Sequence, residues 1–314
     1  MKFYTAYLLL LIFSFTACSQ PKEQEIVNVS TIAKQIKKGE NVLLVNKRIS
    51  GDLLFYLYSE PNDVSLAEFK SFIESSISFQ NCIFEGKVIA YEKRDNATFS
   101  SCFLKNLTFI NCKFTNEVNL RDCEVDGSIN FTDSEFSEQA IFEGLIVKGR
   151  TCSFNNCIFN EIAKFQRTEY YQAASFFKVQ FLNEVNFQAS YFYKDAVFRS
   201  AQFKKKAVFS SLSVLTGLYF NYAIFEDQIL FQNVQCFDKA VFSNAVFMKD
   251  VNFKRCNFYE SVSFNTAKFD STLVLKDCNF MRGKPDFENS IIIDTLKPIF
   301  ENCNYTETKA LKFE

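Results

Sequence analysis

The chain has 314 residues and a formal net charge of -1, so its overall charge provides no attraction toward nucleic acid or an anionic membrane. It contains 40 Phe, no Trp and no His, which excludes catalysis that depends on a histidine acid or base. With only 8 Gly and 4 Pro, few loops interrupt the chain, and one elongated body is a better expectation than two globular domains.

The N-terminus is predicted to be an export signal. An apolar run from Tyr7 to Phe15 is too short to span a bilayer as a mature helix. The stretch FTAC, which ends at Cys18, and the following SQPKEQ resemble the lipobox of bacterial lipoproteins. The resemblance implies that residues 1–17 are a lipoprotein signal peptide, that Cys18 is lipidated, and that Ser19 directs the protein to the outer membrane of a Gram-negative bacterium. In the alternative, the segment is a plain secretory signal and Cys18 has no special role.

Residues 18–29 are expected to form a polar tether between the lipid and the fold. Helix signals follow: Ser30 is a candidate N-cap, Ile32 and Ile36 lie on one face, and Gly39 marks the end. Because the first coil of a solenoid needs a cover, we expect this short helix to cap the N-terminal end.

The next segment, VLLVNKRISGDLLFYLY, is rich in β-branched and aromatic residues and is expected to form strands that lead into the first coil. The segment from Glu60 to Ser76 fits either a loop with one helical turn or a further strand. Residues 30–76 are therefore assigned to a capping helix and leading strands.

The rest of the chain is organised in eleven-residue repeats. A polar stretch at residues 91–96 interrupts the repeats near their start, and one additional residue near Gly149 shifts their register. A small or aliphatic residue lies two positions before each large one, and a second large residue recurs at the eighth position. Nine consecutive units carry a large residue at the third position: Phe187, Phe198, Phe209, Phe220, Phe231, Phe242, Phe253, Phe264 and Leu275. A short fixed period predicts a stacked repeat architecture over residues 77–305, followed by a polar tail at 306–314.

Large residues alternate at spacings of five and six along this array. The pattern resembles the pentapeptide-repeat family, whose five-residue motif places a small residue two positions before Leu or Phe; the departure is one additional residue in every second step. The resemblance implies an all-β fold, a right-handed quadrilateral parallel β-helix with both residues inside. Two units would then form one coil, and Phe187 would stack on Phe209 while Phe198 stacks on Phe220. About ten coils would make a rod roughly 50 Å long.

Six cysteines occupy the inward small position, two residues before a large one: Cys82, Cys112, Cys157, Cys256, Cys278 and Cys303. We expect them to be buried free thiols that act as small hydrophobic residues. Cys256 and Cys278 are one expected coil apart, so a disulfide between them is an alternative in an oxidising compartment. Without His or a Cys-x-x-Cys motif, neither a metal site nor a cofactor is expected.

Residues 22 apart should also stack on the outside of the rod. The position after the eighth-position residue gives six apolar side chains in consecutive coils: Tyr171, Tyr193, Leu215, Phe237, Tyr259 and Met281. An exposed apolar strip usually marks a contact surface, here for a protein, a glycan or a second copy of the chain. In the alternative, a neighbouring loop covers the strip, or strand preference alone explains its aromatic residues.

The run Lys204–Lys206 could indicate nucleic-acid binding, but one coil later the matching residues are Glu226, Asp227 and Gln228. Opposite charges would therefore stack across coils, as on a solvated sheet, and nucleic acid is disfavoured as a partner.

No nucleophile–histidine pair or Gly-rich phosphate loop is present, so an enzyme is not expected. The sequence favours a lipid-anchored, non-enzymatic binding scaffold of the bacterial envelope. One alternative is a DNA mimic similar to the pentapeptide-repeat proteins that protect gyrase; such proteins are cytosolic and carry a negative face, whereas this chain has an export signal and balanced charge. Another is a β-helix carbohydrate-active enzyme, although Asp294 and the neighbours Lys276 and Asp277 do not form an acidic cluster.

Overall fold

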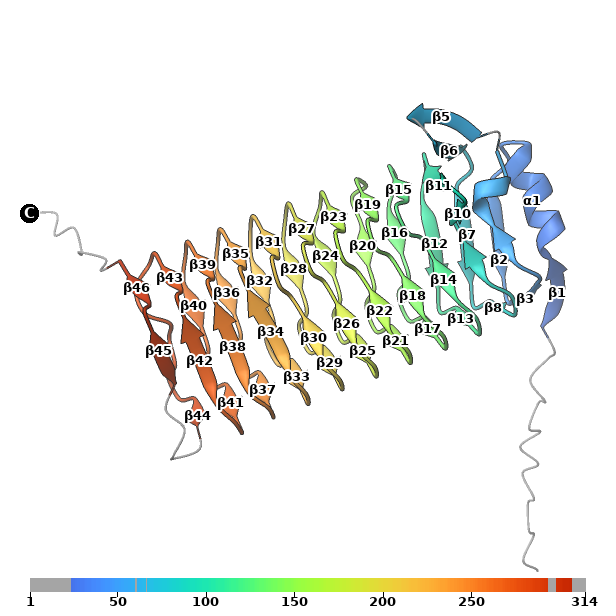
Figure 1. Cartoon of the computed structure of the whole chain (residues 1–314). Coiled ribbons are helices and arrows are strands. Elements are labelled where there is room, and N and C mark those ends of the chain that lie inside the picture. The colour runs from blue at the N-terminus through green and yellow to red at the C-terminus, as the bar shows by residue number, and fades with distance from the viewer. Residues whose placement is uncertain (1–23, 60, 66, 293–297, 307–314) are drawn as a thin grey trace, which may run out of the picture.

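The computed structural model describes residues 24–59, 61–65, 67–292 and 298–306, and these residues form a long rod with four sides (Figure 1). Each side is one sheet along which parallel strands from successive coils are hydrogen-bonded, and the four sheets contain 12, 13, 10 and 11 strands. The predicted four-sided parallel β-solenoid is therefore confirmed. It has more coils than the ten expected, because strands before residue 77 also join the sheets.

We letter the four sheets A to D in the chain order of their first strands. Sheet A runs from β1 (Glu25–Asn28) to β44 (Ile291–Ile292), sheet B from β2 (Val42–Val45) to β40 (Val262–Ser263), and sheet C from β4 (Leu53–Leu54) to β45 (Ile299–Glu301). Most strands are only two residues long. Sheet D begins with the longer β5, β6 and β11 described below and continues through β15 (Glu124–Val125), β19 (Ile146–Val147), β23 (Glu169–Tyr170), β27 (Tyr191–Phe192), β31 (Ser213–Val214), β35 (Gln235–Cys236), β39 (Asn257–Phe258), β43 (Asn279–Phe280) and β46 (Asn304–Tyr305).

Columns of stacked phenylalanine rings fill the rod. Phe187 lies 5.2 Å from Phe209 with nearly parallel rings, and Phe198 lies 4.9 Å from Phe220 in the same way. Between the two columns the contacts are edge-to-face, as for Phe187 and Phe198 at 5.0 Å and 81°. All four side chains are fully buried. Coil spacing therefore sets the stacking within a column, while the offset between columns gives the edge-to-face geometry that aromatic rings prefer.

Each coil turns at two kinds of corner. Phe187 and Ser190 flank a corner of two residues, whereas Phe192 and Ala196 flank a corner of three. In the tight corner, Ala189 has a φ of 57°, in the left-handed region, and the Ser190 amide donates to the Phe187 carbonyl at 3.2 Å. The spacing of five spans the tight corner and the spacing of six spans the wider one. The additional residue of every second step therefore lies in the three-residue corners.

The same tight-corner position is left-handed in all nine consecutive units: Ala189, Ser200, Ser211, Tyr222, Asn233, Asn244, Arg255, Thr266 and Asp277. Asn and Asp tolerate this conformation better than an aromatic residue does. Tyr222 has a φ of 59° and is 58% exposed, so it gains little from packing. We expect Tyr222→Asn to raise the free energy of unfolding by about 1 kcal/mol in urea denaturation. Tyr219→Asn, on a neighbouring strand without positive φ, should give no such gain, and an equal gain there would contradict the explanation.

The additional residue near Gly149 also lies in a corner. Strand β16 (Ile129–Asn130) pairs with β20 (Cys152–Ser153), so this coil has 23 residues instead of 22. The surplus is taken up between Val147 and Cys152, and the strands on either side keep their register.

The predicted capping helix is present as α1 (Val29–Lys37), which packs Ile32 and Ile36 onto the first coil. The sequence predicts Ser30 as the N-cap, but the N-cap is Asn28. The Asn28 side chain accepts a hydrogen bond from the Ser30 amide at 2.9 Å. Strand β1 holds Asn28 in an extended conformation immediately before the helix, so the cap lies two residues earlier. Within the described residues, no helix is long and apolar enough to cross a bilayer.

The tether prediction is wrong for residues 25–29. Strand β1 pairs in parallel with β3 (Lys47–Ser50), Val27 packs against the core, and Lys47 forms an ion pair with Glu25. Strand β1 therefore covers the edge of β3 at the start of sheet A, which a polar tether would leave unpaired. Residues 1–23, which include the predicted signal peptide and Cys18, and residues 307–314 of the predicted tail lie outside the described residues.

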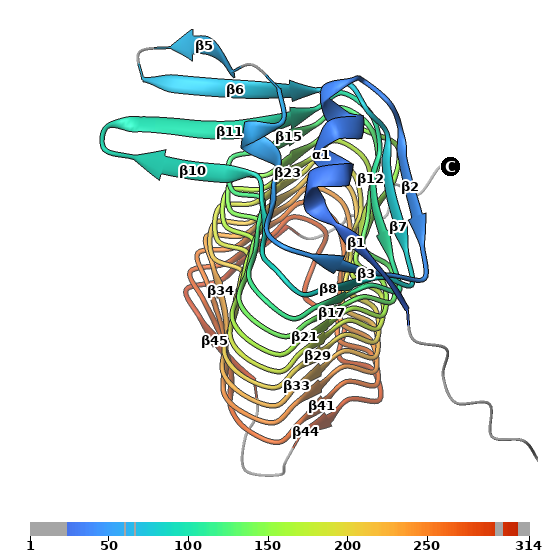
Figure 2. The same ribbon diagram turned by 90° about the vertical axis from the view of Figure 1, so that its right-hand side faces the viewer.

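Two hairpins project from the N-terminal part of the rod (Figure 2). The segment left open by the sequence forms β5 (Pro61–Ser65) and β6 (Glu68–Ile73), and the polar interruption lies in β10 (Tyr91–Arg94) and the turn to β11 (Ala97–Phe103). Strands β6 and β11 pair in parallel along their length, which joins both hairpins into one extension of sheet D. Between α1 and these hairpins the chain forms β2, β3, β4 and a 3-10 turn at Phe55–Leu57 instead of continuous strand.

The inward cysteines are buried as predicted, except that Cys303, in the last coil, is only partly buried. Their thiols donate to carbonyls of the preceding coil, as Cys157 does to Phe131 at 2.9 Å. Ser190 makes the same contact to Phe165 at 2.6 Å. Cys256 and Cys278 are free thiols in this structure.

Candidate functional site

The six residues of the predicted apolar strip lie at the corners that follow sheet D, which have three residues each except the last, where Met281 begins a corner of four. Tyr171, Tyr193, Leu215, Phe237, Tyr259 and Met281 come directly after β23, β27, β31, β35, β39 and β43. Their backbone amides bind the preceding coil: the Tyr193 amide donates to the Tyr170 carbonyl and the Phe237 amide to the Val214 carbonyl, both at 2.9 Å. The strands of sheet D form a row along the rod (Figure 1), so the six side chains follow one corner.

The strip is partly exposed, and its rings stack in two pairs. Tyr171 and Tyr193 lie 4.3 Å apart, and Phe237 and Tyr259 lie 4.5 Å apart with an interplanar angle of 4°. Leu215, between the pairs, is half-buried, whereas Phe237 remains 40% exposed. The tyrosine hydroxyls also interact: a hydrogen bond with Tyr171, together with burial, raises the pKa of Tyr193 to about 12. Tyr193 therefore stays uncharged at neutral pH.

Polar residues flank the strip. In the coil before it, Lys148 occupies the equivalent position and pairs with Asp126 at 3.2 Å. Beside its C-terminal half, Asn257, Asn279 and Asn304 form a column of amide hydrogen bonds at 2.7 and 2.8 Å. Such a polar border around an apolar centre is typical of contact surfaces.

A hollow that sequence reasoning missed lies beside the projecting hairpins. It encloses about 290 Å³ and is lined by Phe69 of β6, Tyr91 of β10, Ile146 of β19, and the corner residues Asp122 and Gly144. Gly144 has a φ of 69°, and a Cβ there would lie 2.1 Å from the Asp122 carboxylate. Only the polar interruption at 91–96 hinted that the chain leaves the rod here.

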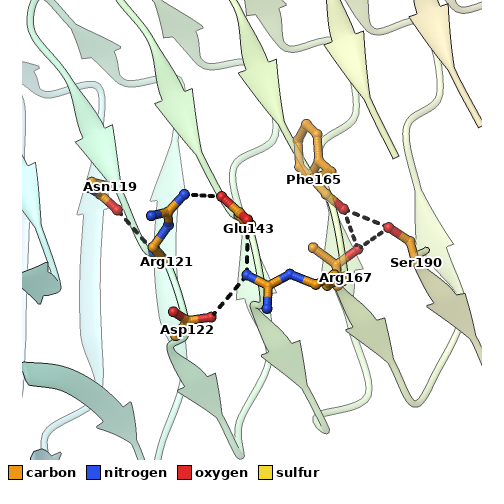
Figure 3. A network of polar contacts seen from close by, with 8 residues as sticks. Asn119, Arg121, Asp122, Glu143, Phe165, Arg167 and Ser190 are labelled. Atoms are coloured by element: carbon orange, nitrogen blue, oxygen red, sulfur yellow. Dashed lines mark hydrogen bonds and ion pairs between the residues drawn. The ribbon is translucent and has the colours of Figure 1, made fainter. Parts of the chain in front are cut away.

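A charged network continues from this hollow along the tight corners of three successive coils (Figure 3). Glu143 pairs with Arg121 of the preceding coil and with Arg167 of the following one, the latter at 2.9 Å. Arg167 also lies 3.8 Å from Asp122. Burial raises the pKa of Glu143, but hydrogen bonds from Arg167 and Arg121 outweigh it and lower the pKa overall. These charges neutralise one another across coils, so we assign the network a structural role in joining successive coils and not a role in binding.

One described group of side chains has the composition of a metal site: Cys102, Glu124 and Asp126 offer ligand atoms within 4.8 Å of one another. Lys70 lies 3.2 Å from Glu124, and Lys148 pairs with both carboxylates. Burial raises the pKa of the Cys102 thiol to about 11, which opposes the thiolate that a metal would need. The group therefore does not fit a metal ion, since lysines already neutralise its carboxylates.

The lysine run Lys204–Lys206 lies on the side of the rod opposite the strip, and the expected charge pairing across coils is present at Lys204. Lys204 forms an ion pair with Glu226 one coil later. This is charge pairing across parallel strands on a solvated face.

The repeat geometry agrees with the comparison to known families. A family model described as Pentapeptide repeats (9 copies) matches residues 109–158 and 237–291. The chain contains pentapeptide repeats. Between the two matched stretches the inward positions follow the same order, with Ala196 and Phe198 buried as an equivalent pair. No curated protein and no solved structure matches the chain.

The pentapeptide-repeat pattern also explains where the strip comes from. A strict five-residue step leaves two residues for each corner, whereas every second corner here has three. Each strip residue is the first residue of its corner, as Tyr193 is in the corner 193–195. The strip thus follows the corners that depart from the five-residue motif.

Proposed function

We propose that this pentapeptide-repeat protein is a lipid-anchored, non-enzymatic binding scaffold of the bacterial cell envelope, which binds its partner through the apolar strip at the corner after sheet D. The single observation that carries the binding role is the strip itself, in which two pairs of stacked rings, together with Leu215 and Met281, leave partly exposed apolar side chains along six consecutive coils. The fold supports a non-enzymatic repeat protein, because its interior is filled by side chains. The resemblance of the segment around Cys18 to a lipobox supports the anchor and the outer-membrane location.

The partner chemistry follows from the strip. Uncharged rings edged by amides and hydroxyls suit a protein surface or a glycan, and a second copy of the chain would offer the same groups. Nucleic acid is not favoured, since the strip lacks the cations that bind phosphate.

Replacing Tyr193, Phe237 and Tyr259 together by Ser should weaken association about tenfold or more while the fold persists. The side chains are partly exposed and lie outside the core, so unfolding in urea should change little. Association is measured by self-association in sedimentation and by crosslinked pulldown from intact envelopes, with purified envelope glycans tested separately.

The matched control replaces three outward apolar residues at other corners, Phe177, Tyr222 and Met248, by Ser. It should leave association unchanged. Equal loss in both triple variants, or no loss in the strip variant, would remove the strip as the binding surface.

The anchor is tested separately in cells. Palmitate labelling of the chain and its sensitivity to globomycin should both disappear in Cys18→Ala. Labelling that persists in this variant, or that is absent from the native chain, would contradict lipidation at Cys18.

A further inference from the structure

The N-terminal end of the rod exposes aliphatic side chains around the point where the described chain begins. Ile26 on β1 is 63% exposed, and Leu43 and Val45 on β2 are 65% and 38% exposed. The Gln24 side chain donates to the Asn81 carbonyl at 2.9 Å, at the corner where sheets A and B meet. Ile26 and Val45 therefore lie on the two sides of this corner, one on each sheet.

The same end carries positive charge. Helix α1 has no acidic residue in its first turn, and Lys34 and Lys37 of its last turn are exposed. Lys38 lies 3.9 Å from Glu40, so it adds less to the net charge. Figure 2 looks onto this end and shows α1, β1 and β2 together on it.

The length of chain before Gln24 indicates what covers this surface. Cys18 lies six residues before Gln24, and six residues span at most about 20 Å. If Cys18 carries a lipid, this end is held beside the bilayer, whereas any other partner would have to displace the membrane from it. Aliphatic side chains next to lysines are the combination that suits the interface of an anionic bilayer.

We propose that the surface formed by Ile26, Leu43 and Val45, together with Lys34 and Lys37, rests on the bilayer that holds the anchor. The inference depends on the proposed lipidation of Cys18. It orients the rod: the α1 end contacts the lipid, and the far end with β44 and β45 points away from it. The partner is a membrane surface that contains anionic phospholipid.

The absence of Trp from the chain allows a direct test. Leu43→Trp places a single tryptophan on the proposed surface, and Ile291→Trp is a matched control at the other end, where Ile291 is 62% exposed. Each full-length lipoprotein is reconstituted into vesicles of phosphatidylethanolamine and phosphatidylglycerol, with and without brominated acyl chains. In floated vesicles, brominated lipid should quench the Leu43→Trp emission about twofold or more and leave Ile291→Trp unchanged. Val45→Trp repeats the measurement at a second site.

The outcomes separate the two proposals. Protein that floats without quenching of Leu43→Trp overturns this inference and leaves the anchor intact, whereas protein that does not float overturns both. Equal quenching of the two tryptophans overturns the orientation. Shielding of Leu43→Trp from aqueous iodide that increases with protein concentration, without quenching by brominated lipid, assigns the surface to a second copy and overturns the lipid assignment.

The charge contribution has its own test. Lys34→Glu combined with Lys37→Glu, in the Leu43→Trp background, should reduce quenching in vesicles with phosphatidylglycerol and leave flotation unchanged. Unchanged quenching would remove the lysines from the surface.

Discussion

Replacing Phe231 by Ala should lower the free energy of unfolding by about 3–5 kcal/mol, which is the usual cost of truncating a buried Phe. The ring is fully buried and lies 5.4 Å from Phe209 and 4.6 Å from Phe253 in its own column. It also meets Phe242 of the neighbouring column at 5.7 Å. These neighbours belong to coils fixed by backbone hydrogen bonds, so they cannot collapse into the space that the ring leaves.

Urea unfolding followed by circular dichroism measures this loss. The control is Leu230→Ala, which shortens an outward-facing side chain on the same strand, β34 (Ile229–Gln232), and should cost less than about 1 kcal/mol. A cost below about 1 kcal/mol for Phe231→Ala would mean that the ring columns do not hold the coils together.

Introducing a side chain at Gly149 should also be strongly destabilising, because the corners of two coils come into close contact there. A Cβ on Gly149 would lie 2.0 Å from the Gly127 carbonyl oxygen, closer than any real Cβ contact. The atom it meets is backbone, so neither coil can yield by moving a side chain. We expect Gly149→Val to cost about 2–3 kcal/mol, at the upper end of overpacking effects.

Arg150→Val is the control in the same corner, since Arg150 is exposed. It should change the free energy of unfolding by less than about 0.5 kcal/mol. If Gly149→Val were as mild as this control, the close approach of the two corners would be incorrect.

The repeat sequence allowed the core and the apolar strip to be predicted together. Once a coil of 22 residues is assumed, the buried rings from Phe187 to Phe264 and the strip residues follow from counting. This works because parallel pairing without slippage places Phe187 under Phe209 inside and Tyr171 under Tyr193 outside. The repeat spacing does not predict whether a partner binds the strip, since binding depends on a second molecule.

The N-terminal region could not be predicted to the same degree, because it does not repeat. Asn28 and Ser30 are both good N-caps, and the choice depends on where β1 ends, which depends in turn on pairing with β3. The hairpins were missed for a similar reason. The pairing of β6 with β11 is fixed by the closure of a whole coil between them, and no local pattern reports this.

The modular corners have a consequence for the length of the rod. The coil that contains Gly149 absorbs a surplus residue in one corner without disturbing the strands on either side. Removing or duplicating one complete 22-residue turn would therefore shorten or lengthen the protein by about 4.8 Å and leave the remaining interior as it was. The number of turns therefore sets the length of the rod. Gain or loss of whole turns in the gene would change how far the distal end reaches without a change in the contacts of the remaining turns.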